Sequence, residues 1–165
     1  MAHSETQSNR RRRPVLGLLC CFCLLMAGCS ADTGFIDFAT LVRATSPNTA
    51  LACPAELCQA PADLITETIA LPADQLAAQV VETLAKEPRT ELVARDATGL
   101  KFVFVQRSRL FRFPDTVNIA VMPLDATHAG LAIYSRSNYG HGDFGVNIAR
   151  VTDWLAKLGV AVKAG

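Results

Sequence analysis

The sequence lacks the short motifs that mark the common catalytic and cofactor sites. It has no nucleophile elbow, no Walker loop and no glycine-rich dinucleotide fingerprint. Histidine is scarce, with 3 residues in 165, and the clustered histidines or partner cysteines that a zinc site needs are absent. These absences exclude the familiar site types, and we expect neither a metal nor a cofactor.

An excess of positive charge is also missing. The formal net charge of the chain is +1. Residues 1–28 hold four arginines and one glutamate, so the rest of the chain carries 12 basic and 14 acidic residues, a net charge of −2. Because nucleic-acid binding normally requires a basic surface, we expect no nucleic-acid partner.

The first 28 residues have the features of an export signal. Four arginines, Arg10–Arg13, precede an apolar run of 13 residues, Val15–Ala27, which is too short to span a bilayer comfortably. The run ends in small residues before Cys29, as in a bacterial lipobox. We predict cleavage after residue 28 and acylation of Cys29, which would anchor the chain in a membrane. The alternatives are an ordinary secretory signal, an uncleaved signal anchor and a twin-arginine signal.

The predicted location is the cell envelope. Ser30 follows the lipobox cysteine. By resemblance to Gram-negative lipoprotein sorting, the lack of Asp at this position predicts an outer-membrane protein that faces the periplasm, if the cell has two membranes. The first expected partner is therefore the membrane itself.

Cysteine usage agrees with export. Only Cys53 and Cys58 follow the proposed anchor. In an oxidising compartment we favour a disulfide between them as a structural link. Two reduced thiols, half of a metal site and a redox pair are the alternatives.

The rest of the chain is predicted to form a tether, residues 29–45, and one domain, residues 46–165. The segment 46–61 contains three prolines and is predicted to be irregular. Apolar periodicity predicts strands over 64–71, 89–95, 100–107, 116–124 and 131–137, and helices over 73–87 and 144–158. Neighbouring strands with short turns favour an α+β fold: a single antiparallel sheet of about five strands with two helices packed on one face.

The stretch between the last predicted strand and helix combines turn residues with polar side chains. Asp143 follows two glycines and is a good helix N-cap. Helical spacing aligns Asp143, Asn147 and Arg150 on a stripe beside the apolar stripe that begins at Phe144. We predict that these three side chains and Arg136 tie the last strand to the last helix. The alternative is an anionic ligand held by the two arginines.

This stretch resembles the C-terminal signature of the DUF1499 family, S-R-S-x-x-G-x-x-D-x-G-x-N-x-x-R. The matching positions are Ser135, Arg136, Ser137, Gly140, Asp143, Gly145, Asn147 and Arg150. Two further segments, 46–53 and 108–115, are similar to the family, so the resemblance covers about residues 46–158. It implies a fold and a compartment, and it carries no reaction.

Arginines gather around the same stretch. The predicted polar cluster, a ligand site or a structural one, consists of Arg107, Arg112, Asp115, Ser135, Arg136, Ser137, Asp143, Asn147 and Arg150. Converging guanidinium groups would suit a phosphate, a carboxylate or a lipid headgroup. Pairing with nearby aspartates would make the cluster structural. His141 with Asp143 and Ser137 outlines a nucleophile–base–carboxylate set, but a solvent-facing loop histidine is the preferred interpretation.

Three function classes follow, and in each the catalytic residues are unknown. The preferred class is a non-catalytic envelope lipoprotein that binds a small anionic or amphiphilic ligand. A deep apolar pocket capped by Arg136 and Arg150 would favour it. The second is a scaffold or assembly lipoprotein that binds another envelope protein, favoured by a flat exposed apolar patch. The third is an enzyme with an unfamiliar site, favoured by a strongly perturbed pKa in a cleft.

Overall fold

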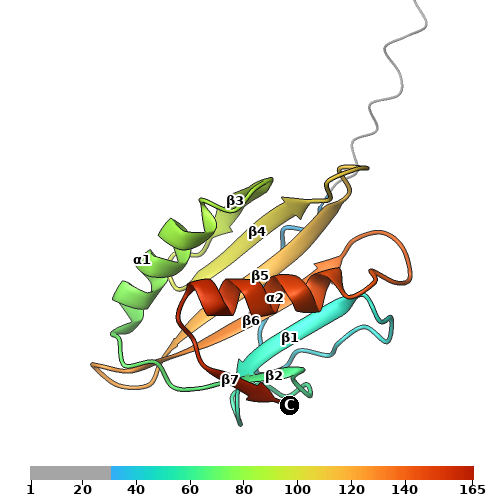
Figure 1. The fold of residues 1–165 in the computed structure, drawn as a ribbon. Helices are drawn as coiled ribbons and strands as arrows, with labels where there is room; N and C mark the ends of the chain where they lie inside the picture. Colours follow the sequence, from blue (N-terminus) through green and yellow to red (C-terminus); the bar gives the residue numbers. More distant parts are fainter. Residues whose placement is uncertain (1–30) are drawn as a thin grey trace, which may run out of the picture.

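The structure, a computed structural model, describes residues 31–165. The predicted leader and the predicted lipidation of Cys29 lie outside the described residues. Two helices, α1 (Ala73–Leu84) and α2 (Val146–Lys157), pack on a seven-stranded sheet (Figure 1). The strands are β1 (Thr49–Pro54), β2 (Leu64–Thr66), β3 (Thr90–Arg95), β4 (Lys101–Arg107), β5 (Pro114–Pro123), β6 (Ala129–Ser137) and β7 (Val162–Ala164). Neither described helix has the length and apolar character needed to cross a membrane.

The sheet is larger than predicted and mixed. Its strand order is β3-β4-β5-β6-β1-β2-β7, and β1 and β2 run parallel while their other neighbours are antiparallel. The α+β class is confirmed, but the expectation of about five strands in a purely antiparallel sheet is wrong. The prolines of the segment 46–61 concealed β1, although Pro54 only ends that strand. The strand β7 was not predicted because its three residues are exposed and show no apolar alternation. Only its pairing with β2 defines it as a strand.

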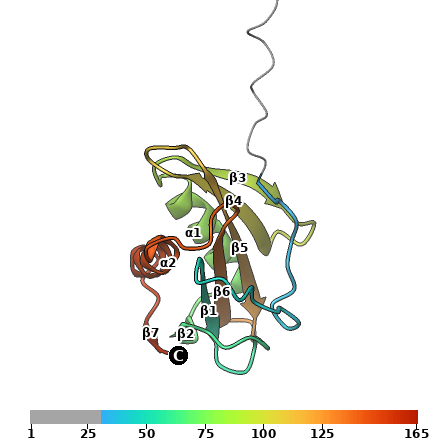
Figure 2. The same ribbon diagram turned by 90° about the vertical axis from the view of Figure 1, so that its right-hand side faces the viewer.

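Both helices cover the same face of the sheet (Figure 2). Leu76 and Val80 of α1 and Trp154 of α2 are buried in one apolar layer with the aromatic side chains of β4. The rings of Trp154 and Phe104 meet edge to face, with centroids 6.2 Å apart. This packing positions α2 over β6 and β1, so that the first turn of α2 lies above one end of the sheet.

The N-terminal part of the described chain covers the opposite face. Phe38 is buried there in a second apolar cluster that includes Tyr134. Arg43 forms an ion pair with Asp63, with Nη2 and Oδ2 2.8 Å apart. The segment 32–45, part of the predicted tether, therefore lies against the sheet from Asp32 onward.

The predicted disulfide is present. Cys53 at the end of β1 is bonded to Cys58 in the connection to β2. Closing so short a loop stabilises the folded state by about 2 kcal/mol in the chain-entropy treatment. The bond thus fastens the chain where it leaves a central strand for the parallel crossover.

Candidate functional site

The helix-facing side of the sheet becomes polar at one end. The strand register places Gln106 of β4 opposite Asp115 of β5, and Asp115 opposite Ser137 of β6. Ser135 lies on the same face, because alternate residues of a strand point to the same side. These polar side chains continue strands whose other inward residues belong to the apolar core.

Arg150 of α2 lies over this polar end and its side chain is 4% exposed. Nη2 forms an ion pair with Oδ2 of Asp115 at 2.7 Å. Nε donates to Oε1 of Gln106 at 2.6 Å, and Nη1 donates to Oγ of Ser135 at 2.8 Å and to Oδ1 of Asn147 at 2.7 Å. All three guanidinium nitrogens are bonded within the protein, which favours the structural interpretation of this arginine over a ligand site.

Asn147 is the second centre of the network and is fully buried. Its Nδ2 donates to the carbonyl of Asn48 at 2.9 Å, to Oγ of Ser137 at 3.0 Å and to Oδ2 of Asp143 at 2.6 Å. Its Oδ1 accepts from Oγ of Ser135 at 2.6 Å. One side chain therefore joins the segment before β1, the end of β6 and the start of α2.

Asp143 accepts hydrogen bonds at the start of α2, but the helix begins later than expected and its N-cap is Gly145, so the prediction that Asp143 is the N-cap is wrong. Its Oδ1 accepts from the backbone N–H of Gly145 at 3.0 Å, and its Oδ2 accepts from that of Asn147 at 2.8 Å. Gly145 has φ of 78°, which glycine adopts without steric cost, and α2 starts at Val146. Phe144 lies outside the helix and is fully exposed, so the expectation that it begins the apolar stripe is wrong.

The other predicted arginines are not brought to this network. Arg136 points to the opposite face of the sheet, where its Nη2 lies 2.7 Å from Oδ2 of Asp32. Hydrogen bonding from Arg136 lowers the pKa of Asp32. Nη1 of Arg107 donates to the carbonyl of Arg112 at 3.3 Å, and Arg112 is exposed. Of the arginines in the predicted cluster, Arg150 alone belongs to the described network.

The nucleophile–base–carboxylate outline does not form. His141 is exposed, whereas Ser137 and Asp143 both bond to Asn147. Within the network the hydroxyl of Ser135 donates to an amide oxygen and not to a base. A serine in that position is not activated as a nucleophile.

Two carboxyl groups with low pKa values lie in exposed turns. The hydroxyl of Thr98 and three backbone N–H groups lower the pKa of Asp96 to about 2. The backbone N–H of Thr127 and the side chain of His128 do the same for Asp125, also to about 2. The hydrogen bonds that fix the two turns explain both shifts without a catalytic role.

Two members of the network, Asn48 and Gln106, are not predicted from the sequence. Nδ2 of Asn48 donates to the carbonyl of Gly140 at 2.7 Å, and its Oδ1 accepts from Oγ of Ser46 at 2.6 Å. Asn48 therefore holds the loop between β6 and α2. The similarity of segment 46–53 to the family was a signal for Asn48, whereas Gln106 becomes visible only through its register with Asp115.

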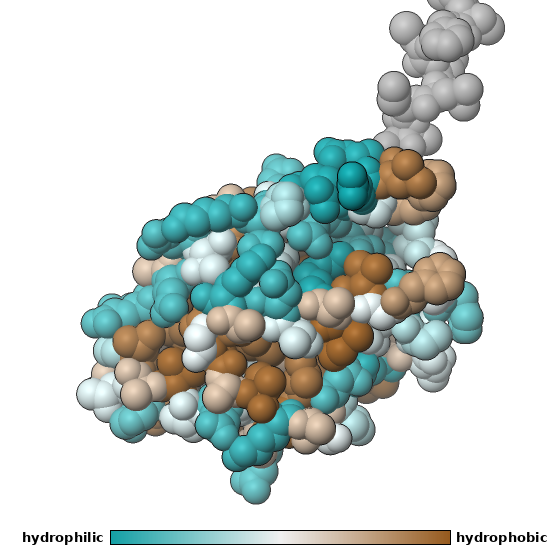
Figure 3. Space-filling view, viewed as in Figure 1, coloured by the Kyte–Doolittle hydropathy of each residue, from teal (hydrophilic) through white to brown (hydrophobic). Residues whose placement is uncertain are grey.

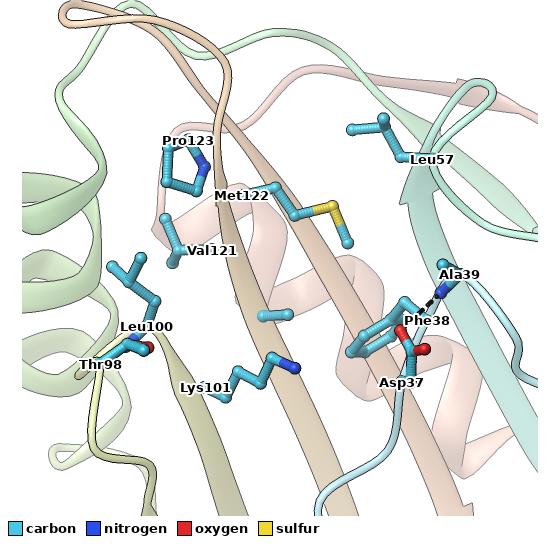
Figure 4. Close-up of a pocket in the computed structure, with 11 residues that line it drawn as sticks. Asp37, Phe38, Ala39, Leu57, Thr98, Leu100, Lys101, Val121, Met122 and Pro123 are labelled. Carbon is cyan, nitrogen blue, oxygen red and sulfur yellow. Dashed lines mark hydrogen bonds between the residues drawn. The ribbon is translucent and has the colours of Figure 1, made fainter.

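A pocket of about 400 Å³ opens on the face opposite the helices (Figure 4). The N-terminal segment, the turn between β3 and β4 and the end of β5 border it. Its lining residues are mostly apolar: Asp37, Phe38, Ala39, Leu57, Thr98, Leu100, Lys101, Ala120, Val121, Met122 and Pro123. Lys101 reaches across the pocket towards the side on which Asp37 and Phe38 lie. It forms no ion pair with any residue of 31–165.

No group of three or more His, Cys, Asp or Glu residues in this same part of the chain is arranged to hold a metal ion. The functional candidates are thus the buried network around Arg150 and the apolar pocket with Lys101 at its edge.

Comparison with known proteins agrees with the sequence resemblance. No curated protein matches the chain. The model of a family described as "Protein of unknown function (DUF1499)" matches residues 43–158. The matched region includes every residue of the network, from Asn48 to Arg150. Because the match extends over more than half of the sequence, the chain belongs to the DUF1499 family.

Proposed function

We propose that this protein is an exported, lipid-anchored protein of the cell envelope that binds a small amphiphilic anion in the pocket beside Lys101. The observation that carries the ligand is the pocket itself, which is apolar in most of its lining and has one cation without an ion-pair partner among the described residues. The proposed role is non-catalytic. If the cell has two membranes, the protein belongs to the outer membrane and faces the periplasm.

The lining of the pocket supports an amphiphile. A volume of about 400 Å³ lies within the range of small-molecule sites. The half-buried side chains of Leu100 and Met122 offer apolar surface, and methionine adapts its shape to irregular ligands. The carboxylate of Asp37 is occupied by the N–H of Ala39 and the hydroxyl of Thr40. An acidic headgroup would therefore meet Lys101 while an apolar chain fills the rest.

The network around Arg150 supports the non-catalytic role. The guanidinium group, the amide of Asn147 and the carboxylate of Asp115 all bond to one another or to neighbouring side chains. A substrate would have to break these bonds to reach the charged groups. The pocket remains the better place for a ligand, although Lys101, rather than Arg136 or Arg150, is the cation beside it.

Laurate, an amphiphilic anion, is expected to raise the melting temperature of the protein below its micelle concentration. Replacing Lys101→Gln should weaken laurate binding about fivefold, since an exposed charge pair contributes up to about 1 kcal/mol. Met122→Trp should abolish it by filling the pocket. Thermal melting followed by circular dichroism, with laurate titrated, gives both results.

Two controls make the laurate test specific. Dodecyltrimethylammonium has the same kind of chain with the opposite charge and should not stabilise the protein. Lys86→Gln removes an exposed lysine just after α1 and should leave laurate binding unchanged. Equal stabilisation by both detergents, or in all variants, would rule out the proposed site.

The anchor is tested separately with Cys29→Ser. Without the acylated thiol the protein should leave the membrane fraction or accumulate as precursor, because several acyl chains supply the stable attachment. Cell fractionation and intact-mass measurement report the outcome. A mature protein that lacks added acyl mass and still sediments with membranes contradicts lipidation.

A further inference from the structure

The connection between β4 and β5, residues 108–113, presents large apolar side chains to solvent. Leu110 is 78% exposed, Phe111 68% and Phe113 44%. The rings of Phe111 and Phe113 stack with centroids 5.6 Å apart, and the ring of Phe113 lies 5.8 Å from that of Tyr139 in the loop after β6. We call these four residues the aromatic tip. Clustered exposed side chains of this kind mark an interaction surface.

The loop that carries the tip is closed by hydrogen bonds. The backbone N–H of Ser108 donates to the carbonyl of Phe113 at 2.9 Å, and the N–H of Phe113 donates back to Oγ of Ser108 at 3.0 Å. Arg107 bridges to the carbonyl of Arg112 at 3.3 Å. The backbone therefore holds the apolar side chains outward at the end of the sheet.

Positive charge accompanies the tip. Arg107, Arg109 and Arg112 alternate with its apolar residues, and the segment 101–114 contains no Asp or Glu. None of these arginines forms an ion pair with a residue in the described part of the chain. Apolar and aromatic side chains mixed with free cations are the composition that binds an anionic lipid surface. In Figure 3 hydrophilic and hydrophobic side chains lie side by side at this end of the molecule.

The N-terminal end of the described chain lies at the same end of the sheet. Asp32 pairs with Arg136 at 2.7 Å, and its carbonyl accepts from Oγ1 of Thr116 at 2.9 Å. Thr116 is the third residue of β5, directly after the loop of the tip. Figures 1 and 2 both show the start of the described chain and the β4–β5 connection at one end of the domain.

The distance to the predicted anchor is short. Cys29 precedes Asp32 by three residues, which span at most about 10 Å when extended. Because Asp32 is bonded to the sheet, acyl chains on Cys29 would keep this end of the domain near the lipid surface. The tip is then the part of the described surface best placed to contact lipid.

We propose that the aromatic tip inserts into the headgroup region of an anionic membrane, with Arg109 and Arg112 bound to lipid phosphates. The proximity argument rests on the proposed lipid anchor, whereas the composition of the tip does not. The strand β5 has ten residues, about 33 Å in length. Docking therefore places the pocket, at the far end of β5, on the side away from the membrane.

The test places an indole at the tip. Phe111→Trp is prepared in the protein purified from its membranes and reconstituted into vesicles of phosphatidylcholine and phosphatidylglycerol with brominated acyl chains. The added fluorescence is expected to shift to the blue in matched vesicles without bromine and to be quenched in the brominated vesicles. Leu124→Trp, at the opposite end of β5, should keep its emission. The wild type, whose Trp154 is buried, supplies the baseline.

Charge is tested on the same background. Arg109→Gln with Arg112→Gln should weaken docking about 25-fold in anionic vesicles, because each arginine near the surface contributes about fivefold. Lys86→Gln with Lys163→Gln, which removes two charges elsewhere, should have no effect.

Equal quenching at positions 111 and 124 overturns the proposal. So does a blue-shifted indole at 111 without quenching, which would indicate that the tip is buried against a second copy of the protein. If Cys29 proves not to be acylated, the protein is added to preformed vesicles, and positions 111 and 124 are compared in the same way. The experiment therefore distinguishes a wrong prediction of the anchor from a wrong prediction of membrane insertion by the tip.

Discussion

Replacing Arg150→Ala is expected to lower the free energy of unfolding by about 3–5 kcal/mol. The change leaves the carboxylate of Asp115 without its cation in a position where that side chain is 11% exposed. It also removes the donors that Gln106 and Ser135 accept from. An uncompensated buried charge costs far more than an exposed one, so the effect should exceed that of any surface arginine.

Urea denaturation followed by circular dichroism measures this loss. Arg109→Ala, in the exposed β4–β5 loop, is the matched control and should change stability by less than about 0.5 kcal/mol. Arg150→Ala combined with Asp115→Ala should be less destabilised than the sum of the single changes, since the orphaned charge is then gone. No added anion should restore Arg150→Ala. Stabilisation of the wild type by phosphate that Arg150→Ala abolishes, or a loss as small as that of Arg109→Ala, would contradict the structural role.

Asn147→Ala should have the second-largest effect, a loss of about 2–4 kcal/mol, because each buried polar group left without a partner costs about 1–3 kcal/mol. The amide links the carbonyl of Asn48, the hydroxyl of Ser137 and the carboxylate of Asp143. Without it the segment before β1 loses its direct bond to α2. The same denaturation experiment applies, with Asp153→Ala on the exposed side of α2 as the control.

Asn147→Asp distinguishes the loss of the hydrogen-bond donor from the loss of side-chain volume. It preserves size but can turn an oxygen towards Oδ2 of Asp143, where Nδ2 now lies at 2.6 Å. Two adjacent carboxylates raise a pKa in the folded state. A raised folded pKa favours folding at acid pH and loses that benefit as the pH rises. The deficit of this variant should therefore shrink on acidification, and a deficit independent of pH would mean that volume alone matters.

The apolar patterns predicted most of the sheet and both helices, because these elements are long enough for their periodicity to be detected in the sequence. The run 101–106 and the alternation in 131–137 correspond to β4 and β6. Besides the nearby prolines, small inward residues concealed the strand β1: Ala50 and Ala52 have little strand preference, yet the sheet buries them fully. Pairing with β6 on one side and β2 on the other fixes the position of β1 in the sheet, and a local sequence pattern does not contain this information.

The candidate site was predicted in part for the same reason. Asp143, Asn147 and Arg150 share a helix stripe, and helical spacing alone places them together. Arg136 follows Ser135 directly, so a strand must send the two side chains to opposite faces. Ser135 reaches Arg150, and Arg136 reaches Asp32 on the other side. The sequence does not show which of these two side chains faces α2; only the packing of α2 on the sheet decides it.

The strand order also constrains when the chain can fold. The first strand, β1, lies inside the sheet, where Thr49 pairs with Arg136 of β6 and Ala52 pairs with Leu64 of β2. The outer neighbour of β2 is β7, the last strand of the described residues. A chain that emerges N-terminus first therefore has an unpaired edge on β1 until its last third is available, and such distant pairings form slowly. If the chain is exported as proposed, its sheet can be completed only after β7, which pairs with β2, has crossed the membrane.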